Sequence, residues 1–205
     1  ATVIDLASLE PRPLPALHPE AHVRAAFDVA WLDDRRLAVA EPNVGVVLHE
    51  PGARQARVLH RADFAWTLAV LGPRRLLVGT GDGGLVELDP VSGAVRRRLG
   101  GHDRGVSAIA TTPDGRRLIT ADDAGAVVVR DRRDGRSLLR LGGAGAGAVL
   151  SLAISPDGRA IATGHTDGSA RVWAIGPPWG PPAADVPVPA SRSAAPGGPE
   201  ARRSP

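Results

Sequence analysis

The segment Pro113-Asp114-Gly115-Arg116-Arg117-Leu118 recurs along the chain in related forms. Similar steps from a turn into an apolar run occur at residues 33–37, 72–76 and 156–161. The apolar residues that end these steps are spaced 39, 42 and 43 residues apart, and they are Leu37, Leu76, Leu118 and Ile161. Self-similarity at a fixed period of about 40 residues is the signature of a repeat architecture. The sequence therefore predicts four similar structural units.

The third unit shows how each repeat divides into strands. Its four apolar runs are predicted strands at 106–111, 117–121, 126–130 and 137–141. Turn signals with an Asp-Gly step separate the first strand from the second and the third from the fourth. The run Val127-Val128-Val129 is apolar on both faces of its strand, which indicates sheets packed face to face rather than a sheet with one solvated side.

The repeats resemble the WD-repeat β-propeller family, whose units of about 40 to 45 residues carry Gly-His near the start and Trp-Asp after the third strand. The third unit opens with Gly101-His102 and has Arg130-Asp131 in place of Trp-Asp, whereas the fourth keeps Trp173 without the following Asp. No unit has the intact pair, so the repeats are degenerate. The resemblance implies an all-β fold, a β-propeller of four-stranded antiparallel blades, with about four blades and a partial one at the N-terminus.

The repeat period also gives expected boundaries. Residues 1–20 are expected to end a preceding blade, and the blades that follow are expected at 21–60, 61–101, 102–143 and 144–175, the last without a fourth strand. Nine of the 19 prolines fall in residues 176–205, which are expected to form a Pro-rich disordered tail. A tail that docks as polyproline in an aromatic groove is the alternative.

Ring closure has three possible solutions. In the family that the repeats resemble, a strand from the N-terminal end completes the last blade, because an open array leaves an unpaired edge. We therefore expect the C-terminal part of a longer propeller, whose remaining blades, in the same or another chain, close the ring. The alternatives are a small closed ring, latched by a strand at residues 12–17, and a dimer that pools its blades.

The resemblance further implies a buried hydrogen-bonded set in each blade, linking a His, a Ser or Thr of the second strand, a turn residue and the Trp. The matching positions in this sequence are His60, His102, Asn43, Asp82, Thr120, Thr163, Asp167 and Trp173. The turn position of the third unit is Ala124, which cannot bond. The implied role is structural, since each buried polar group left without its partner costs about 1 to 3 kcal/mol.

By the same resemblance, partners bind the loops that lead into each first strand and those that join the second strand to the third. These loops hold Arg61, Asp63, Asp103, Arg104, Asp122, Asp123, His165 and Thr166. We expect a non-catalytic scaffold for a protein or peptide, with an upstream effector domain as a family expectation. An enzyme or small-ligand-binding propeller acting through its central channel is the alternative. The small, apolar first strands at 107–110 and 151–154 offer that channel few reactive groups.

Other chemistries find little support in the sequence. The absence of Cys excludes disulfides and thiolate metal sites, and a net charge of +3 gives no argument for nucleic acid. No apolar run approaches the roughly 20 residues that span a bilayer. His18 and His22 have the spacing of metal ligands on a helix, but prolines surround them and no third ligand is evident. No metal or catalytic residue is therefore expected.

Two further motifs have simpler explanations. The glycine-rich run 142–147 lacks the following helix of a dinucleotide site, so no cofactor is expected. The arginines at 96–98 and between 130 and 140 are interpreted as charges that keep outer strands from pairing. The chain begins with Ala1, so a signal peptide cannot be assessed, and a cytoplasmic location is the expectation that we carry forward.

Overall fold

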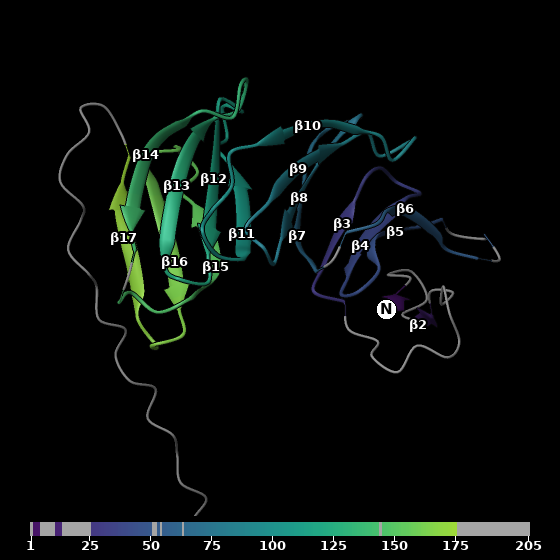
Figure 1. Ribbon diagram of the computed structural model, residues 1–205, viewed down its shortest axis with the longest axis horizontal. Coiled ribbons are helices and arrows are strands. Elements are labelled where there is room, and N and C mark those ends of the chain that lie inside the picture. The colour runs from purple at the N-terminus through teal and green to yellow at the C-terminus, as the bar shows by residue number, and fades with distance from the viewer. Residues whose placement is uncertain are drawn as a thin grey trace, which may run out of the picture.

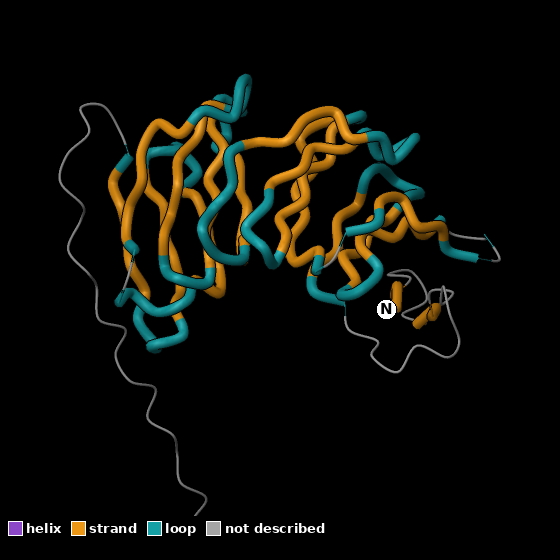
Figure 2. The backbone as a smooth tube through the Cα atoms, in the orientation of Figure 1, coloured by secondary structure: helices purple, strands orange, loops and turns teal. Residues whose placement is uncertain are grey.

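The computed structural model describes residues 2–4, 11–13, 26–50, 53, 55–62, 64–143 and 145–175. Strands joined by turns and loops make up this part of the chain, and it contains no helix (Figure 2). Accordingly, none of these residues belongs to a helix able to cross a membrane. The predicted tail at 176–205 and the His18 and His22 pair lie outside the described residues.

The strands form five antiparallel sheets, and in each of them neighbouring strands follow chain order. The first four-stranded sheet contains β3 (Asp28–Trp31), β4 (Leu37–Glu41), β5 (Gly45–His49) and β6 (Arg57–His60). The second contains β7 (Ala65–Gly72), β8 (Arg75–Thr80), β9 (Leu85–Leu88) and β10 (Val95–Leu99).

The third sheet contains β11 (Val106–Thr111), β12 (Arg117–Asp122), β13 (Ala126–Asp131) and β14 (Ser137–Gly142). The last sheet has three strands, β15 (Val149–Ile154), β16 (Ala160–His165) and β17 (Ala170–Ala174). A separate pair joins β1 (Thr2–Ile4) to β2 (Pro11–Pro13). The strands expected in the third unit are present, three of them one residue longer than expected.

Local hydrogen bonds explain the recurring turn between the first and second strands. In the third sheet Thr112 Oγ1 donates to Asp114 Oδ1 at 2.6 Å, and the same oxygen accepts the Arg116 amide at 2.9 Å. Gly115 has φ 66°, a conformation that glycine adopts without steric cost. The last sheet repeats the arrangement, with Ser155 and Asp157 in place of the Thr and Asp.

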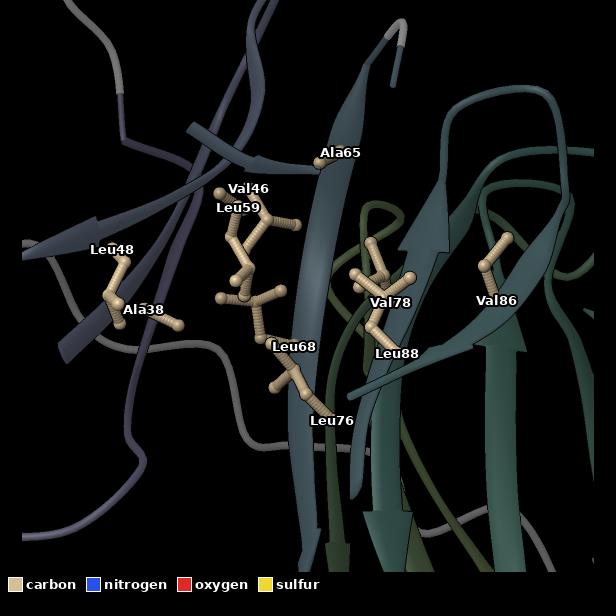
Figure 3. Close-up of a cluster of buried hydrophobic side chains, with 11 residues drawn as sticks. Ala38, Val46, Leu48, Leu59, Ala65, Leu68, Leu76, Val78, Val86 and Leu88 are labelled. Atoms are coloured by element: carbon tan, nitrogen blue, oxygen red, sulfur yellow. The ribbon is translucent and has the colours of Figure 1, made fainter. Parts of the chain in front are cut away.

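Apolar side chains fill the spaces between neighbouring sheets. Figure 3 shows one such layer, with Ala38 and Val46 of the first sheet facing Leu68, Leu76 and Val78 of the second. A second layer joins the second and third sheets, and a third layer joins the third and last sheets. Burial on both faces explains the continuous apolar runs. The four residues that mark the repeat, Leu37, Leu76, Leu118 and Ile161, are all buried near the start of the second strand of their sheets.

The four larger sheets lie in chain order along an open arc (Figure 1). Contacts between successive sheets run mainly through their first strands, from β3 to β7, β7 to β11 and β11 to β15. This is the predicted propeller architecture, and the ring is not closed. On the outward side of the last sheet, Ala153, Ala162 and Ala174 are exposed.

Candidate interaction face

Antiparallel connections place two sets of loops at opposite ends of the strands. We call "loop face" the end that carries the loops leading into each first strand and those joining second to third strands. We call "turn face" the opposite end, which carries the turns from first to second and from third to fourth strands. The described residues that the sequence assigns to partner binding belong to the loop face or to the strand ends beside it.

A buried polar network supports the loop face at the third sheet. His102 Nδ1 lies 2.9 Å from Asp122 Oδ2, and His102 Nε2 lies 2.7 Å from Thr120 Oγ1. Because the carboxylate can only accept, Nδ1 donates to it and Nε2 accepts from the threonine hydroxyl. Burial lowers the pKa of His102 more than the Asp122 hydrogen bond raises it, so this imidazole is neutral. Arg130 donates to Thr120 Oγ1 at 3.3 Å and to the Gly101 carbonyl at 2.9 Å, in the position of the missing Trp.

Asp122 has a different role from the expected one. Asp122 is fully buried, with 0 % exposure, and is therefore not available to a partner. Asp122 Oδ1 accepts the amides of Ala124 at 3.0 Å and Ala126 at 2.8 Å, and so holds the turn between β12 and β13. The sequence assigned this turn-holding position to residue 124. The carboxylate that accepts the turn amides is Asp122, two residues earlier, and it also accepts from His102.

The last sheet contains a related network with the residues in other roles. Thr163 Oγ1 lies 2.8 Å from His165 Nε2 and accepts from Trp173 Nε1 at 3.4 Å. His165 Nδ1 lies 3.3 Å from the Gly147 carbonyl, to which it can donate. The expectation placed His165 among exposed partner-binding loops, but the side chain is buried and bonded inside the sheet. Here the His comes from the end of β16 and not from the loop before β15.

The remaining network candidates lie closer to the surface. Asp167 accepts the Ser169 amide at 2.9 Å, and Asp82 is hydrogen bonded to Thr80, so both hold their own turns. Asn43 is exposed with φ 64°. His60 is half-buried. The structure shows no hydrogen bond from the side chain of either residue to another described residue.

Five of the predicted partner-binding residues are exposed on the loop face, and they are Arg61, Asp103, Arg104, Asp123 and Thr166. Asp103 lies 3.5 Å from Arg140, and Thr166 Oγ1 accepts the Ala148 amide at 2.9 Å. Asp63 lies outside the described residues. The exposed loop residues thus offer both charges on rigidly supported loops.

Sequence reasoning missed an aromatic cluster on this face, the "aromatic rim" of Phe27, Phe64 and Trp66. Phe27 is 52 % exposed and Phe64 is 49 % exposed, and each directly precedes the first strand of its sheet. The rings of Phe27 and Trp66 meet edge to face with centroids 6.3 Å apart. Trp66 packs so closely against Gly105 that an added β-carbon would overlap the indole. One signal was available, since these are the only two phenylalanines in the chain.

The turn face carries ion pairs that the sequence did not reveal. Glu87 of β9 is buried between the second and third sheets, and its carboxylate accepts from Arg75 Nε at 2.6 Å and from Arg97 Nε at 2.7 Å. Burial raises the pKa of Glu87, but the two arginine bonds outweigh this effect and the net pKa is lowered. Arg96 likewise pairs with buried Asp89 at 2.7 Å. Arg96 and Arg97 are therefore ion-pair partners, a role that their interpretation as edge charges did not include.

Comparison with known proteins agrees with this geometry. The protein-family model for the WD domain, G-beta repeat, matches residues 93–131 and 135–174. Residues 93–174 of this chain thus contain two repeats of the WD-repeat β-propeller family. Each matched WD repeat begins around the outer strand of one sheet and continues through the first three strands of the next sheet.

Two similar proteins extend the comparison. The chain is 27 % identical to WD repeat-containing protein 1 of Gallus gallus in an alignment of 162 positions, which covers 73 % of this chain and 26 % of that protein. The WD40 β-propeller domain of Doa1 matches with a TM-score of 0.65 and 19 % identity, covering 74 % of this chain and 51 % of that one. The chain thus spans about a quarter and about half of these two WD-repeat relatives. WD-repeat propellers are generally protein-interaction scaffolds and typically non-catalytic.

Proposed function

We propose that this WD-repeat chain is a non-catalytic scaffold that binds a protein or peptide through its loop face, with the aromatic rim as the anchoring contact. The observation that carries the proposal is the exposure of Phe27 and Phe64 beside Trp66 on this face. Exposed aromatic side chains that converge are typical of interaction sites, where they supply large contact areas at low entropic cost.

The surroundings of the aromatic rim favour a peptide with an apolar anchor and polar flanks. Arg61 and Arg104 are exposed on the loops beside it, and Asp103 and Asp123 add carboxylates. The aromatic rim is thus an apolar centre with a charged border. Protein interfaces have the same arrangement, in which the polar border sets specificity and the apolar centre sets affinity. Trp66 Nε1 is buried and has no hydrogen-bond partner among the described residues, so one donor remains unused at the centre.

Rigid support is the second argument. The loop leading to β11 is tied to the second sheet, because the His102 amide donates to the Gly83 carbonyl at 2.9 Å. The same loop is tied to its own sheet through the Asp123 amide, which donates to the Gly105 carbonyl at 3.0 Å. Loops fixed in this way bind without a large ordering cost.

The proposal is tested by selecting peptides from a random display library on the immobilised chain and measuring their affinities. We expect selected peptides to share an apolar or aromatic residue, and to bind Phe64→Ser and Phe27→Ser at least about tenfold more weakly. Val91→Ser is the matched control, because Val91 is 45 % exposed on the turn face. Equal weakening by Val91→Ser, or selected peptides that bind both Phe variants normally, would contradict the proposal. Circular dichroism verifies that each variant is folded.

A further inference from the structure

The turn face contains an open cavity of about 420 Å³ between the second and third sheets, which we call the "turn cavity". Its lining residues come from the start of β8 and from the two turns of the third sheet, and they are Arg75, Gly115, Arg116, Asp131, Arg132 and Arg133. Four arginines and a single carboxylate thus line one cavity. Such an excess of fixed positive charge favours an anionic ligand.

The framework of the turn cavity is held by hydrogen bonds. Arg132 Nη1 donates to the Gly115 carbonyl at 3.1 Å, and its Nη2 bonds to the Leu71 carbonyl of the second sheet. Arg97 donates to the carbonyls of Arg133 at 2.5 Å and Arg132 at 3.0 Å, which fixes the turn after β13 against the second sheet. These bonds fix the Arg132 guanidinium and the backbone that carries Arg133 before any ligand arrives, and preorganisation lowers the cost of binding.

Positive charge exceeds negative charge in the lining of the turn cavity. Arg75 is neutralised by Glu87, but Arg116 and Arg133 are exposed and form no ion pair with another described residue. The lone carboxylate, Asp131, uses Oδ1 to accept the Arg133 amide at 2.7 Å. Arg132 Nε is a further donor with no partner among the described residues.

We propose that the turn cavity binds the dianionic phosphate group of a phosphomonoester. The planar fork of a guanidinium matches two oxygens of a phosphate, and several arginines together complement its double charge better than that of a single carboxylate. The cavity is larger than a phosphate group alone, which leaves room for the part of the ligand that carries it. The group can belong to a small phosphorylated molecule or to a phosphorylated residue. The site is distinct from the aromatic rim, because it lies at the opposite end of the strands.

Calorimetric titration of the full chain tests this proposal with two kinds of probe. Phenyl phosphate represents a small phosphomonoester. A phosphoserine tripeptide with blocked termini and no other charged group, compared with its unphosphorylated form, represents a phosphorylated residue. We expect at least one probe to bind with a dissociation constant below about 10 mM. The probe that binds more tightly identifies whether the phosphate group belongs to a small molecule or to a phosphorylated residue. Since the second phosphate pKa is about 6, affinity is expected to rise from about pH 5 to about pH 7.5.

Variants separate a built site from general charge attraction. The double variant Arg116→Gln/Arg133→Gln removes two exposed guanidiniums that hold no part of the fold, and we expect affinity to fall at least about tenfold. Arg35→Gln/Arg98→Gln is the matched control, with the same loss of charge at exposed residues outside both proposed sites, and is expected to bind within about twofold of the wild type. Equal weakening by the two double variants, or no binding of either probe to the folded chain, would overturn the proposal. Peptide binding at the aromatic rim is measured in parallel, so failure of one proposal is distinguishable from failure of the other.

Discussion

Replacing Asp122 by alanine is expected to destabilise the third sheet severely. The carboxylate is buried and accepts three hydrogen bonds, from the His102 ring and from the amides of Ala124 and Ala126. The His102 ring and the Ala126 amide are buried, so both donors would lose their partner without gaining water. At about 1 to 3 kcal/mol for each unsatisfied buried donor, the free energy of unfolding should fall by about 2 to 6 kcal/mol.

Urea denaturation followed by tryptophan fluorescence measures this loss. Asp122→Asn retains an acceptor for the turn amides and is expected to lose less than Asp122→Ala. The neighbouring control Asp123→Ala removes an exposed carboxylate and should change the free energy of unfolding by no more than about 0.5 kcal/mol. If Asp122→Ala and Asp123→Ala were equally stable, the assignment of Asp122 as the central acceptor of the network would be refuted.

Three further predictions follow from contacts in the same sheets. Burial lowers the folded-state pKa of His102, so below about pH 6.5 the unfolded chain binds more protons than the folded chain. The contribution of His102 to stability should therefore be complete above that pH and decrease as the pH falls. A urea midpoint that rises on acidification would contradict this. Glu87→Gln should lower the free energy of unfolding by about 1 to 3 kcal/mol, since the two arginines that Glu87 bridges lose their counter-charge, whereas exposed Arg98→Gln should have little effect in the same assay. Gly83→Ala should lower the thermal midpoint more than Gly168→Ala, because both glycines have positive φ but only at Gly83 would the new β-carbon collide with a backbone carbonyl; equal midpoints would contradict this.

The repeat made the fold accessible from sequence. Leu76 and Leu118 carry no chemistry that identifies a propeller, but their regular spacing and the Asp-Gly turns around residues 113–118 defined the strand limits closely. These signals are local, because turn residues and apolar alternation act within a few positions. The degenerate signature did not matter, since stacking of the sheets depends on apolar faces rather than on an intact Trp-Asp pair.

The site was harder to predict, because its residues act across sheets or exchange roles between units. Asp122 and His165 occupy equivalent positions at the ends of β12 and β16. Asp122 accepts a hydrogen bond from the imidazole of His102, whereas His165 is itself the imidazole of its network. Glu87 stands in an otherwise apolar layer and is tolerated because arginines from β8 and β10 reach it. The aromatic rim joins residues from two sheets. Single-sequence periodicity carries no information on such pairings.

The offset between WD repeat and sheet ties the units together. The repeat at residues 93–131 includes β10, which is the fourth strand of the second sheet, and then forms three strands of the third sheet. If this repeat unravelled, the preceding sheet would lose its outer strand along with the hydrogen bonds between β9 and β10. Melting of one repeat therefore penalises its neighbour, and this staggering links the repeats into an array that resists fraying one unit at a time.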